Sequence, residues 1–143
     1  MYHMNRARAS AGFSFIEIII AITIVGIMVA GYLGMTSWIV RAQRTRTEGS
    51  LAAIRTAMSQ YETDTGKLPA TLNDLVQRPA DPVVAKRWKS PYIDAKDIEG
   101  DAWHIPYVYQ PTPGSQHSYI LYSWGSKKGD ATPQSEWIDV WNI

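Results

Sequence analysis

The chain of 143 residues contains no cysteine, so it forms no disulfide and holds no metal through thiolates. It also lacks an excess of either charge, because 14 Lys and Arg residues face 13 Asp and Glu residues. The basic residues form no long run. A nucleic-acid-binding surface normally needs clustered positive charge. The composition therefore gives no support to nucleic acid as a partner.

Charged residues are missing altogether between Ile18 and Val40. As a helix, this stretch of about 23 residues would extend about 34 Å, which is enough to cross a hydrocarbon core of about 30 Å. A secretory signal peptide has a shorter apolar region of about 7–15 residues, followed by a small-residue cleavage site. Here Trp38-Ile39-Val40 and three arginines follow instead. We therefore expect a membrane-spanning helix.

Beyond the span, apolar residues continue at helical spacing and form one stripe. The residues of this stripe are Leu51, Ile54, Met58 and Tyr61. Gly66, followed by Pro69, supplies a stop signal. The pattern predicts a single helix from about Phe13 to Thr65, apolar all round in its first half and amphipathic in its second.

The remainder of the chain predicts a small antiparallel sheet. Strands are expected at Pro106–Gln110 and Ser118–Trp124, joined by a Pro-Gly-containing loop at Pro111–His117. A third short strand is expected at Trp137–Trp141. Thr71–Val76 is expected to form a helical turn, whereas Asp81-Pro82 is expected to mark a turn or an extended segment. The fold class expected is α+β, with the long N-terminal helix packed on the sheet.

A short basic leader precedes the span, and Glu17 lies just inside it. A carboxylate costs about 2.5–3.5 kcal/mol at the bilayer centre on insertion scales, so its presence suggests a specific partner. The segment Gly12-Phe13-Ser14-Phe15-Ile16-Glu17 resembles the class III signal of type IV pilin-like proteins, with Ser14 and Phe15 where that family most often has Thr and Leu. The resemblance implies that a prepilin peptidase cuts after Gly12 on the cytoplasmic side and N-methylates Phe13.

After such a cleavage, the new amine of Phe13 is the natural counter-charge for Glu17. Residues four apart share a helix face, so the two groups could pair within one subunit. The family resemblance implies instead that the amine of an incoming subunit meets Glu17 of a neighbour and sets the axial register. In a plain membrane anchor, the carboxylate would simply reach water near the headgroups.

Four further segments resemble the major pseudopilin of type II secretion systems, in the same order along the chain. They are Tyr61–Pro69, Trp88–Ile93, Asp101–Tyr109 and Tyr122–Gly125. In the first, the family typically reads Tyr-x-x-Asp-Asn-Gly-x-Tyr-Pro, and in the third Asp-Pro-Trp-Gly-Asn-Pro-Tyr-x-Tyr. With the leader, the resemblance runs from Gly12 to the C-terminus and implies a type IV pilin-like fold.

The resemblance implies a structural subunit of the type II secretion pseudopilus, a homo-oligomeric helical filament that drives folded proteins across the outer membrane. It also implies single-pass insertion in the inner membrane. The parts expected are a leader peptide at 1–12, a transmembrane and filament-core helix at 13–40, and a periplasmic globular domain at 41–143. The implied partners are the prepilin peptidase, minor pseudopilins, and the inner-membrane assembly platform with its ATPase.

Two alternatives share some of these features. A type IV pilus subunit for adhesion, motility or DNA uptake has the same N-terminal half. Many such pilins close a C-terminal loop with a disulfide, which this chain cannot form, and Asp101–Tyr109 also argues against them. A membrane-anchored periplasmic binding module would explain the span, but it gives no reason for Gly12 and Glu17.

Major pseudopilins also bind calcium in the loop after Tyr-Ser-x-Gly, and this chain departs from their pattern. Calcium takes six to eight oxygen ligands, with carboxylates supplying the charge. Ser126-Lys127-Lys128 stands where the first aspartate is usual. The remaining candidate ligands are Asp130, Glu136 and Asp139. In the alternative interpretation these carboxylates are solvated, and the loop is held by Trp124, Trp137 and Trp141.

No enzymatic site is indicated by the sequence. His104 and His117 have no nucleophile, carboxylate or second histidine at a matching spacing. The glycines around Gly125 lack the strand–glycine–helix context of a phosphate-binding loop. We therefore expect a protein that performs no chemistry itself and is a substrate of the peptidase.

Overall fold

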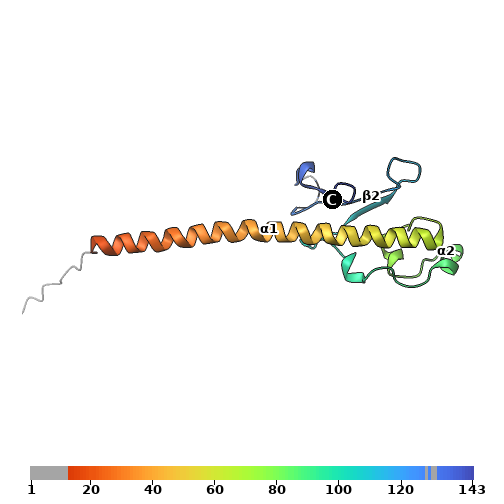
Figure 1. Cartoon of the computed structure of the whole chain (residues 1–143), viewed down its shortest axis with the longest axis horizontal. Coiled ribbons are helices and arrows are strands. Elements are labelled where there is room, and N and C mark those ends of the chain that lie inside the picture. Colours follow the sequence, from red (N-terminus) through yellow and green to blue (C-terminus); the bar gives the residue numbers. More distant parts are fainter. Residues whose placement is uncertain (1–12, 128, 130–131) are drawn as a thin grey trace, which may run out of the picture. The chain divides into compact units, whose positions relative to one another are not determined.

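The computed structural model describes residues 13–127, 129 and 132–143 (Figure 1). A long helix, α1, spans Phe15–Thr65, and short helical segments and a three-stranded sheet follow it. Contacts divide the chain into two units, one up to Ile39 and the other from Val40 to Ile143. The expected α+β class is confirmed.

Helix α1 begins two residues later than the sequence pattern predicted. The carbonyl of Ser14 accepts the first helical hydrogen bonds, from the backbone N–H groups of Glu17 at 2.9 Å and Ile18 at 3.2 Å. Ser14 is therefore the N-cap residue, and Phe13 lies outside the helix. The predicted end at Thr65 is confirmed, and Gly66 adopts the left-handed conformation, with φ of 76°, that commonly ends a helix.

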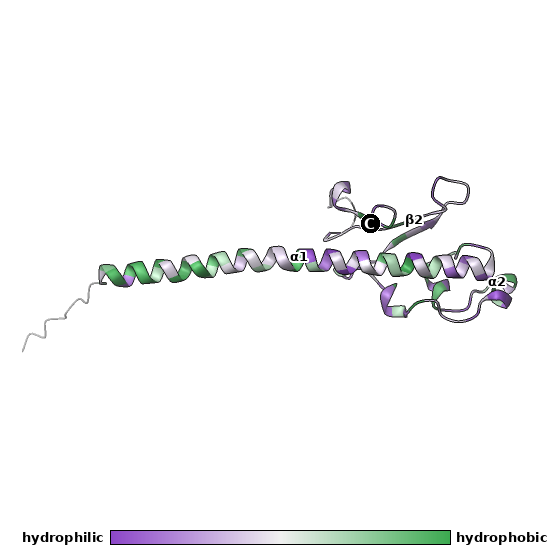
Figure 2. Cartoon of the chain, in the orientation of Figure 1, coloured by the Kyte–Doolittle hydropathy of each residue, from purple (hydrophilic) through white to green (hydrophobic). Residues whose placement is uncertain are grey.

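In the first unit, every side chain from Phe13 to Ile39 is exposed. Figure 2 shows mostly apolar residues along this part of α1 and a mixture of apolar and polar residues beyond it. Within the described residues, α1 is also long and apolar enough to cross a membrane. A helix that is apolar on all sides is stable in lipid or among other apolar helices, so this unit needs one of those surroundings.

In the second unit, the predicted apolar stripe of α1 forms the centre of the core. Tyr61, Leu51, Ile54 and Met58 are 0–1% exposed. They pack with buried residues from the short helices, the sheet and the positions next to its strands. These residues are Leu75, Val84, Tyr107, Tyr119, Leu121, Ile138 and Val140. The amphipathic half of α1 thus buries one face against the rest of the globular domain.

The sheet has the order β1-β2-β3, with both pairs antiparallel. Its strands are β1 (Val108–Pro111), β2 (Tyr119–Ser123) and β3 (Ile138–Asp139). In the predicted hairpin, Val108 pairs with Tyr122 and Pro111 with Tyr119. Residues 119, 121 and 123 of β2 are buried and Ile120 is exposed, as the period of two requires. All three strands are shorter than the sequence indicated.

The short helices confirm one prediction and correct another. The 3-10 helix η1 (Leu72–Leu75) lies within the predicted helical turn, where the carboxylate of Asp74 accepts a hydrogen bond from the Thr71 N–H at 3.0 Å. By contrast, the predicted turn at Asp81-Pro82 begins the helix α2 (Pro82–Arg87). Asp81 caps it by accepting from the Val83 N–H at 2.8 Å, and proline suits the first helical position. Two more 3-10 helices, η2 (Ala95–Asp97) and η4 (Gln134–Glu136), were not predicted.

Candidate assembly site

Glu17 lies in the first turn of α1. A carboxylate in a first helical turn is stabilised by the helix dipole, typically by about 0.3–1 kcal/mol at an exposed site. That gain is smaller than the cost of a charge at the bilayer centre, about 2.5–3.5 kcal/mol, so a carboxylate placed that deep would be stabilised further by a counter-charge. Phe13, which is 78% exposed, lies one residue before the N-cap Ser14. Gly12 lies outside the described residues.

Three other polar side chains along the span form hydrogen bonds within the helix. The Thr23 hydroxyl donates to the Ile19 carbonyl at 2.7 Å, and the Ser37 hydroxyl donates to the Gly34 carbonyl at 2.9 Å. Thr36 makes the same kind of bond, to Leu33 at 3.0 Å. Such side chains enter apolar surroundings at little cost because they bring no unpaired donor. Glu17 is the only side chain of residues 13–40 that is charged at neutral pH, so its free energy depends most on its surroundings.

Beyond the span, the first two pseudopilin-like segments meet at the end of α1. Asp64 pairs with the Lys89 ammonium at 2.5 Å and accepts from the Tyr92 hydroxyl at 3.2 Å. These two bonds lower the pKa of Asp64, and the bond to the carboxylate raises the pKa of Lys89. The ring of Tyr92 also meets Tyr61 edge-on, with centroids 5.5 Å apart. The contacts attach the loop that contains Trp88 to the end of the helix.

The third and fourth segments meet at the carboxylate of Asp101, which is 5% exposed. One of its oxygens accepts from the backbone N–H groups of Trp103 and Ile105, both at 2.9 Å. The other accepts from the Ser123 hydroxyl at 2.5 Å, and the oxygen of that hydroxyl accepts in turn from the Gly125 N–H at 3.0 Å. One buried side chain therefore organises its own loop and connects it to the end of β2.

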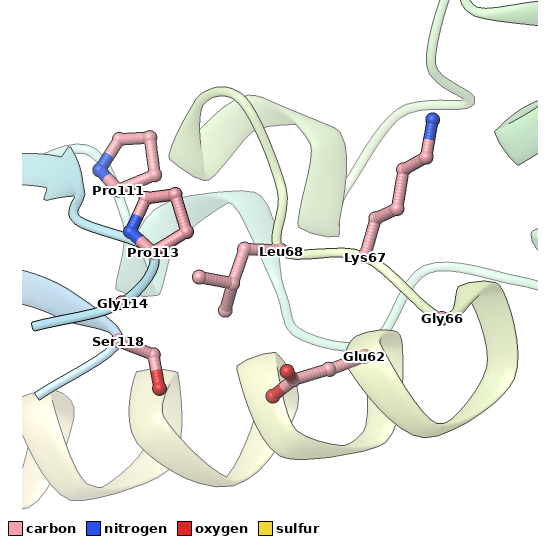
Figure 3. Close-up of a pocket in the computed structure, with 8 residues that line it drawn as sticks. All are labelled: Glu62, Gly66, Lys67, Leu68, Pro111, Pro113, Gly114 and Ser118. Carbon is pink, nitrogen blue, oxygen red and sulfur yellow. The ribbon is translucent and has the colours of Figure 1, made fainter.

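A cavity of about 510 Å³ lies between the end of α1 and the β1–β2 loop (Figure 3). In that view Glu62 and Leu68 point into it, while the ammonium of Lys67 points away. Lys67 lies 3.6 Å from an Asp81 carboxylate oxygen. The remaining lining residues are Gly66, Pro111, Pro113, Gly114 and Ser118. Glu62 is the one carboxylate in this lining, so the described residues of the cavity form no metal-ligand set.

Comparison with known families agrees with this arrangement. Residues 35–142 match the family model described as type II secretion system (T2SS), protein G, and residues 7–33 match the prokaryotic N-terminal methylation motif. The chain belongs to the protein G family of type II secretion systems. This family comprises the major pseudopilins, so the chain is a structural subunit of the pseudopilus, as the resemblance implied. The type IV pilus alternative is not favoured.

Curated relatives cover most of the chain. Type II secretion system core protein G of Pseudomonas aeruginosa is 33% identical over 124 residues, which are 83% of this chain and 85% of that protein. The protein of the same name from Xanthomonas campestris pv. campestris is 31% identical, covering 80% and 78%. The Vibrio cholerae protein is 26% identical, covering 98% and 97%. No solved structure matches the chain.

The calcium ligands expected from the protein G resemblance are only partly described. Asp130 lies outside the described residues, and Glu136 is exposed in η4. Asp139 lies in β3, where its carboxylate accepts from the Trp141 N–H at 2.9 Å. Among residues 13–127, 129 and 132–143, no three His, Asp or Glu side chains come together in a way that could hold a metal.

His104 and His117 have structural positions. His104 adopts a φ of 61°, a left-handed conformation, at the position where the protein G motif has glycine. The His117 ring stacks on Trp141, with centroids 4.3 Å apart, and the Arg55 guanidinium lies 4.9 Å from the Trp141 ring. Neither histidine belongs to a group of metal-binding side chains among the residues described.

Sequence reasoning located the segment containing Asp101 but missed the role of that residue. A local signal was available, because Asp side chains often accept from the backbone N–H two residues on, as Asp101 does from Trp103. The bond to Ser123 had no such signal, since the two residues lie 22 positions apart.

Proposed function

We propose that this protein is made as a precursor with a leader at 1–12, inserts once in the inner membrane through residues 13–40, and places its globular domain, residues 41–143, in the periplasm. A prepilin peptidase then cuts after Gly12 and methylates Phe13. The mature subunit enters a growing pseudopilus, whose extension pushes folded proteins through the outer membrane. The match of residues 7–33 to the N-terminal methylation motif supports the processing step.

The observation that carries this proposal is an apolar helix, exposed on every side, with one carboxylate in its first turn. Moving such a helix from lipid into a bundle of identical helices exchanges one apolar environment for another. Little hydrophobic free energy is gained or lost, because lipid tails are as apolar as neighbouring side chains. The subunit can therefore leave the membrane without passing through a strongly unfavourable state.

Glu17 favours the filament over the bilayer in that exchange. In the filament, the amine of an incoming Phe13 pairs with Glu17 of a neighbouring subunit and neutralises both charges in an apolar core. A pair at the wrong axial position would leave both charges unpaired, which costs several kcal/mol per ion in such surroundings. The pairing thus sets the register of the filament. Contact with minor pseudopilins, the assembly platform and its ATPase belongs to the same proposal.

The test of assembly uses Glu17→Gln, which keeps the shape of the side chain and removes its charge. Asp94→Asn is the matched control, because the Asp94 side chain is 74% exposed and lies in the globular domain. We expect Glu17→Gln to reduce sheared filaments and secreted protein at least tenfold, whereas Asp94→Asn behaves as wild type. Normal filaments from Glu17→Gln would contradict the pairing.

Processing is tested separately by the intact mass of the protein extracted from membranes of its native host. We expect a mature chain that begins at methylated Phe13, in the wild type and in Glu17→Gln alike. If the extracted chain still began at Met1, the span would be a permanent anchor and the filament role would be wrong.

Orientation can be tested because the chain contains no cysteine. A single cysteine at Ser115, which is exposed in the β1–β2 loop, gives one reactive position. A membrane-impermeant maleimide should label Ser115→Cys in cells whose outer membrane alone is permeable. Labelling only after the inner membrane is opened would reverse the proposed orientation.

A further inference from the structure

The loop between β2 and β3, residues 124–137, is where the protein G resemblance places calcium. Among the described residues, no three His, Asp or Glu side chains come together in a way that could hold the ion. The Lys127 carbonyl already accepts from the Thr132 hydroxyl at 2.5 Å, and Asp139 is engaged with the Trp141 backbone at 2.9 Å. In the sequence, Ser126-Lys127-Lys128 stands where the first aspartate of the calcium loop is usual, so one carboxylate ligand is missing.

Aromatic contacts hold both ends of this loop instead. The Trp137 ring stacks on Tyr122 with centroids 4.9 Å apart and planes 3° from parallel. Trp124 meets Trp137 edge-on at 4.5 Å and Tyr122 edge-on at 5.2 Å. Aromatic pairs of this kind stabilise a fold beyond the contribution of the area that they bury. The three rings therefore join β2, the first residue of the loop and the last.

Polar contacts complete the same structure. The indole N–H of Trp137 donates to the Thr132 carbonyl at 3.2 Å, and the Thr132 hydroxyl donates to the Lys127 carbonyl. Gly125 has a φ of 80°, and a Cβ there would lie 3.3 Å from the Glu136 carbonyl oxygen. The two ends of the loop are thus packed backbone to backbone, at a distance that only glycine allows without strain.

We propose that Tyr122, Trp124 and Trp137 form an aromatic clamp that replaces calcium in this chain, so that its globular domain folds and stays closed without the ion. The clamp acts where a metal would act, because it fixes the loop to the end of β2. It needs no cation, since its energy comes from ring packing and from one indole hydrogen bond. This inference concerns stability and is independent of the proposed role in secretion.

The first test uses the wild-type, full-length protein in detergent. Its thermal unfolding is recorded in 10 mM calcium, in 10 mM magnesium and in a chelator. A calcium site with a Kd of about 10⁻⁴ M, typical of extracellular modules, would be occupied about a hundredfold over Kd and would raise the Tm by about 10 °C or more. We expect the three Tm values to agree within about 1 °C. A rise specific to calcium would overturn the proposal.

The second test asks whether the clamp closes the loop. Lys127 and Lys128 lie within it, so a lysine-specific protease reports its opening, and mass spectrometry locates the cut. We expect Trp137→Ala to be cut there at least tenfold faster than wild type, and Trp137→Phe to be cut at an intermediate rate. Calcium should leave all three cutting rates unchanged. Trp38→Ala, in the exposed span, is the matched control and should behave as wild type.

The outcomes of the second test separate the alternatives. Equal cutting of Trp137→Ala and wild type would show that the rings do not hold the loop. Protection of either protein by calcium would show that the ion does. If Trp137→Ala failed to fold, the comparison of wild type with Trp137→Phe and the calcium dependence of wild type would still decide the question.

Discussion

Replacement of Asp101 by alanine should destabilise the globular domain strongly, because the carboxylate is buried and accepts three hydrogen bonds. A hydrogen bond to a charged group contributes about 1.5–3 kcal/mol, and a buried donor left without a partner costs about 1–3 kcal/mol. The three bonds share one side chain, so their energies do not add fully. We expect a loss of about 2–4 kcal/mol. For a domain of about 100 residues this lowers the Tm by about 8 °C or more.

Three further variants test the origin of that loss. Asp101→Asn keeps an oxygen for the Trp103 and Ile105 N–H groups and should lose about half as much. Ser123→Ala removes one partner together with the acceptor of Gly125, which should cost about 1–2 kcal/mol. The double variant of Asp101 and Ser123 should lose less than the sum of the two single losses, because each removes the same bond.

The measurement is thermal and chemical unfolding of the full chain in detergent, followed by tryptophan fluorescence. Asp94→Ala is the control. Its carboxylate is 74% exposed and 3.4 Å from Lys96, so its removal should change the free energy of unfolding by less than about 0.5 kcal/mol. If Asp101→Ala cost no more than Asp94→Ala, the reasoning about the buried carboxylate would be refuted.

For three other substitutions, the structure predicts whether the stability of the fold rises or falls. Lys89 lowers the pKa of Asp64, so this ion pair stabilises the fold at pH values above the ordinary carboxyl pKa of about 4. That stability is lost as the pH falls through the lowered pKa of the folded state. The Tm values of wild type and Asp64→Asn, measured from pH 3 to 7, should therefore converge at the acid end. His104→Gly should raise the Tm by a few degrees, because glycine adopts a φ of 61° without a Cβ clash; a lowered Tm would show that the imidazole makes a compensating contact. Gly125→Ala should cost about 1–3 kcal/mol in chemical unfolding, because its φ is positive and the new Cβ would crowd the Glu136 carbonyl; an unchanged midpoint would show that the loop adjusts freely.

Local patterns in the sequence predicted the helices and strands well where one element supplied all the information. The apolar stripe of α1 required only the helical repeat, and the β1–β2 hairpin required only alternation around a Pro-Gly loop. Helix α2 was missed although Asp81-Pro82 is a good helix start, because the same dipeptide also marks turns. In the candidate assembly site, Glu17 was found because a charge stands out in an apolar segment, and its pairing with a neighbour stays a proposal.

The sequence alone determined the features that depend on neighbouring residues along the chain. It predicted a membrane helix, because no charge interrupts the apolar segment. It predicted an amphipathic continuation, because the apolar residues repeat about every 3.6 residues. Only the tertiary structure decided which distant groups meet. Lys89 reaches Asp64 across 25 positions, Ser123 reaches Asp101 across 22, and Trp137 packs on Tyr122 across a loop. Such contacts have no sequence period, since they form only after packing brings separate elements together and excludes water from between them.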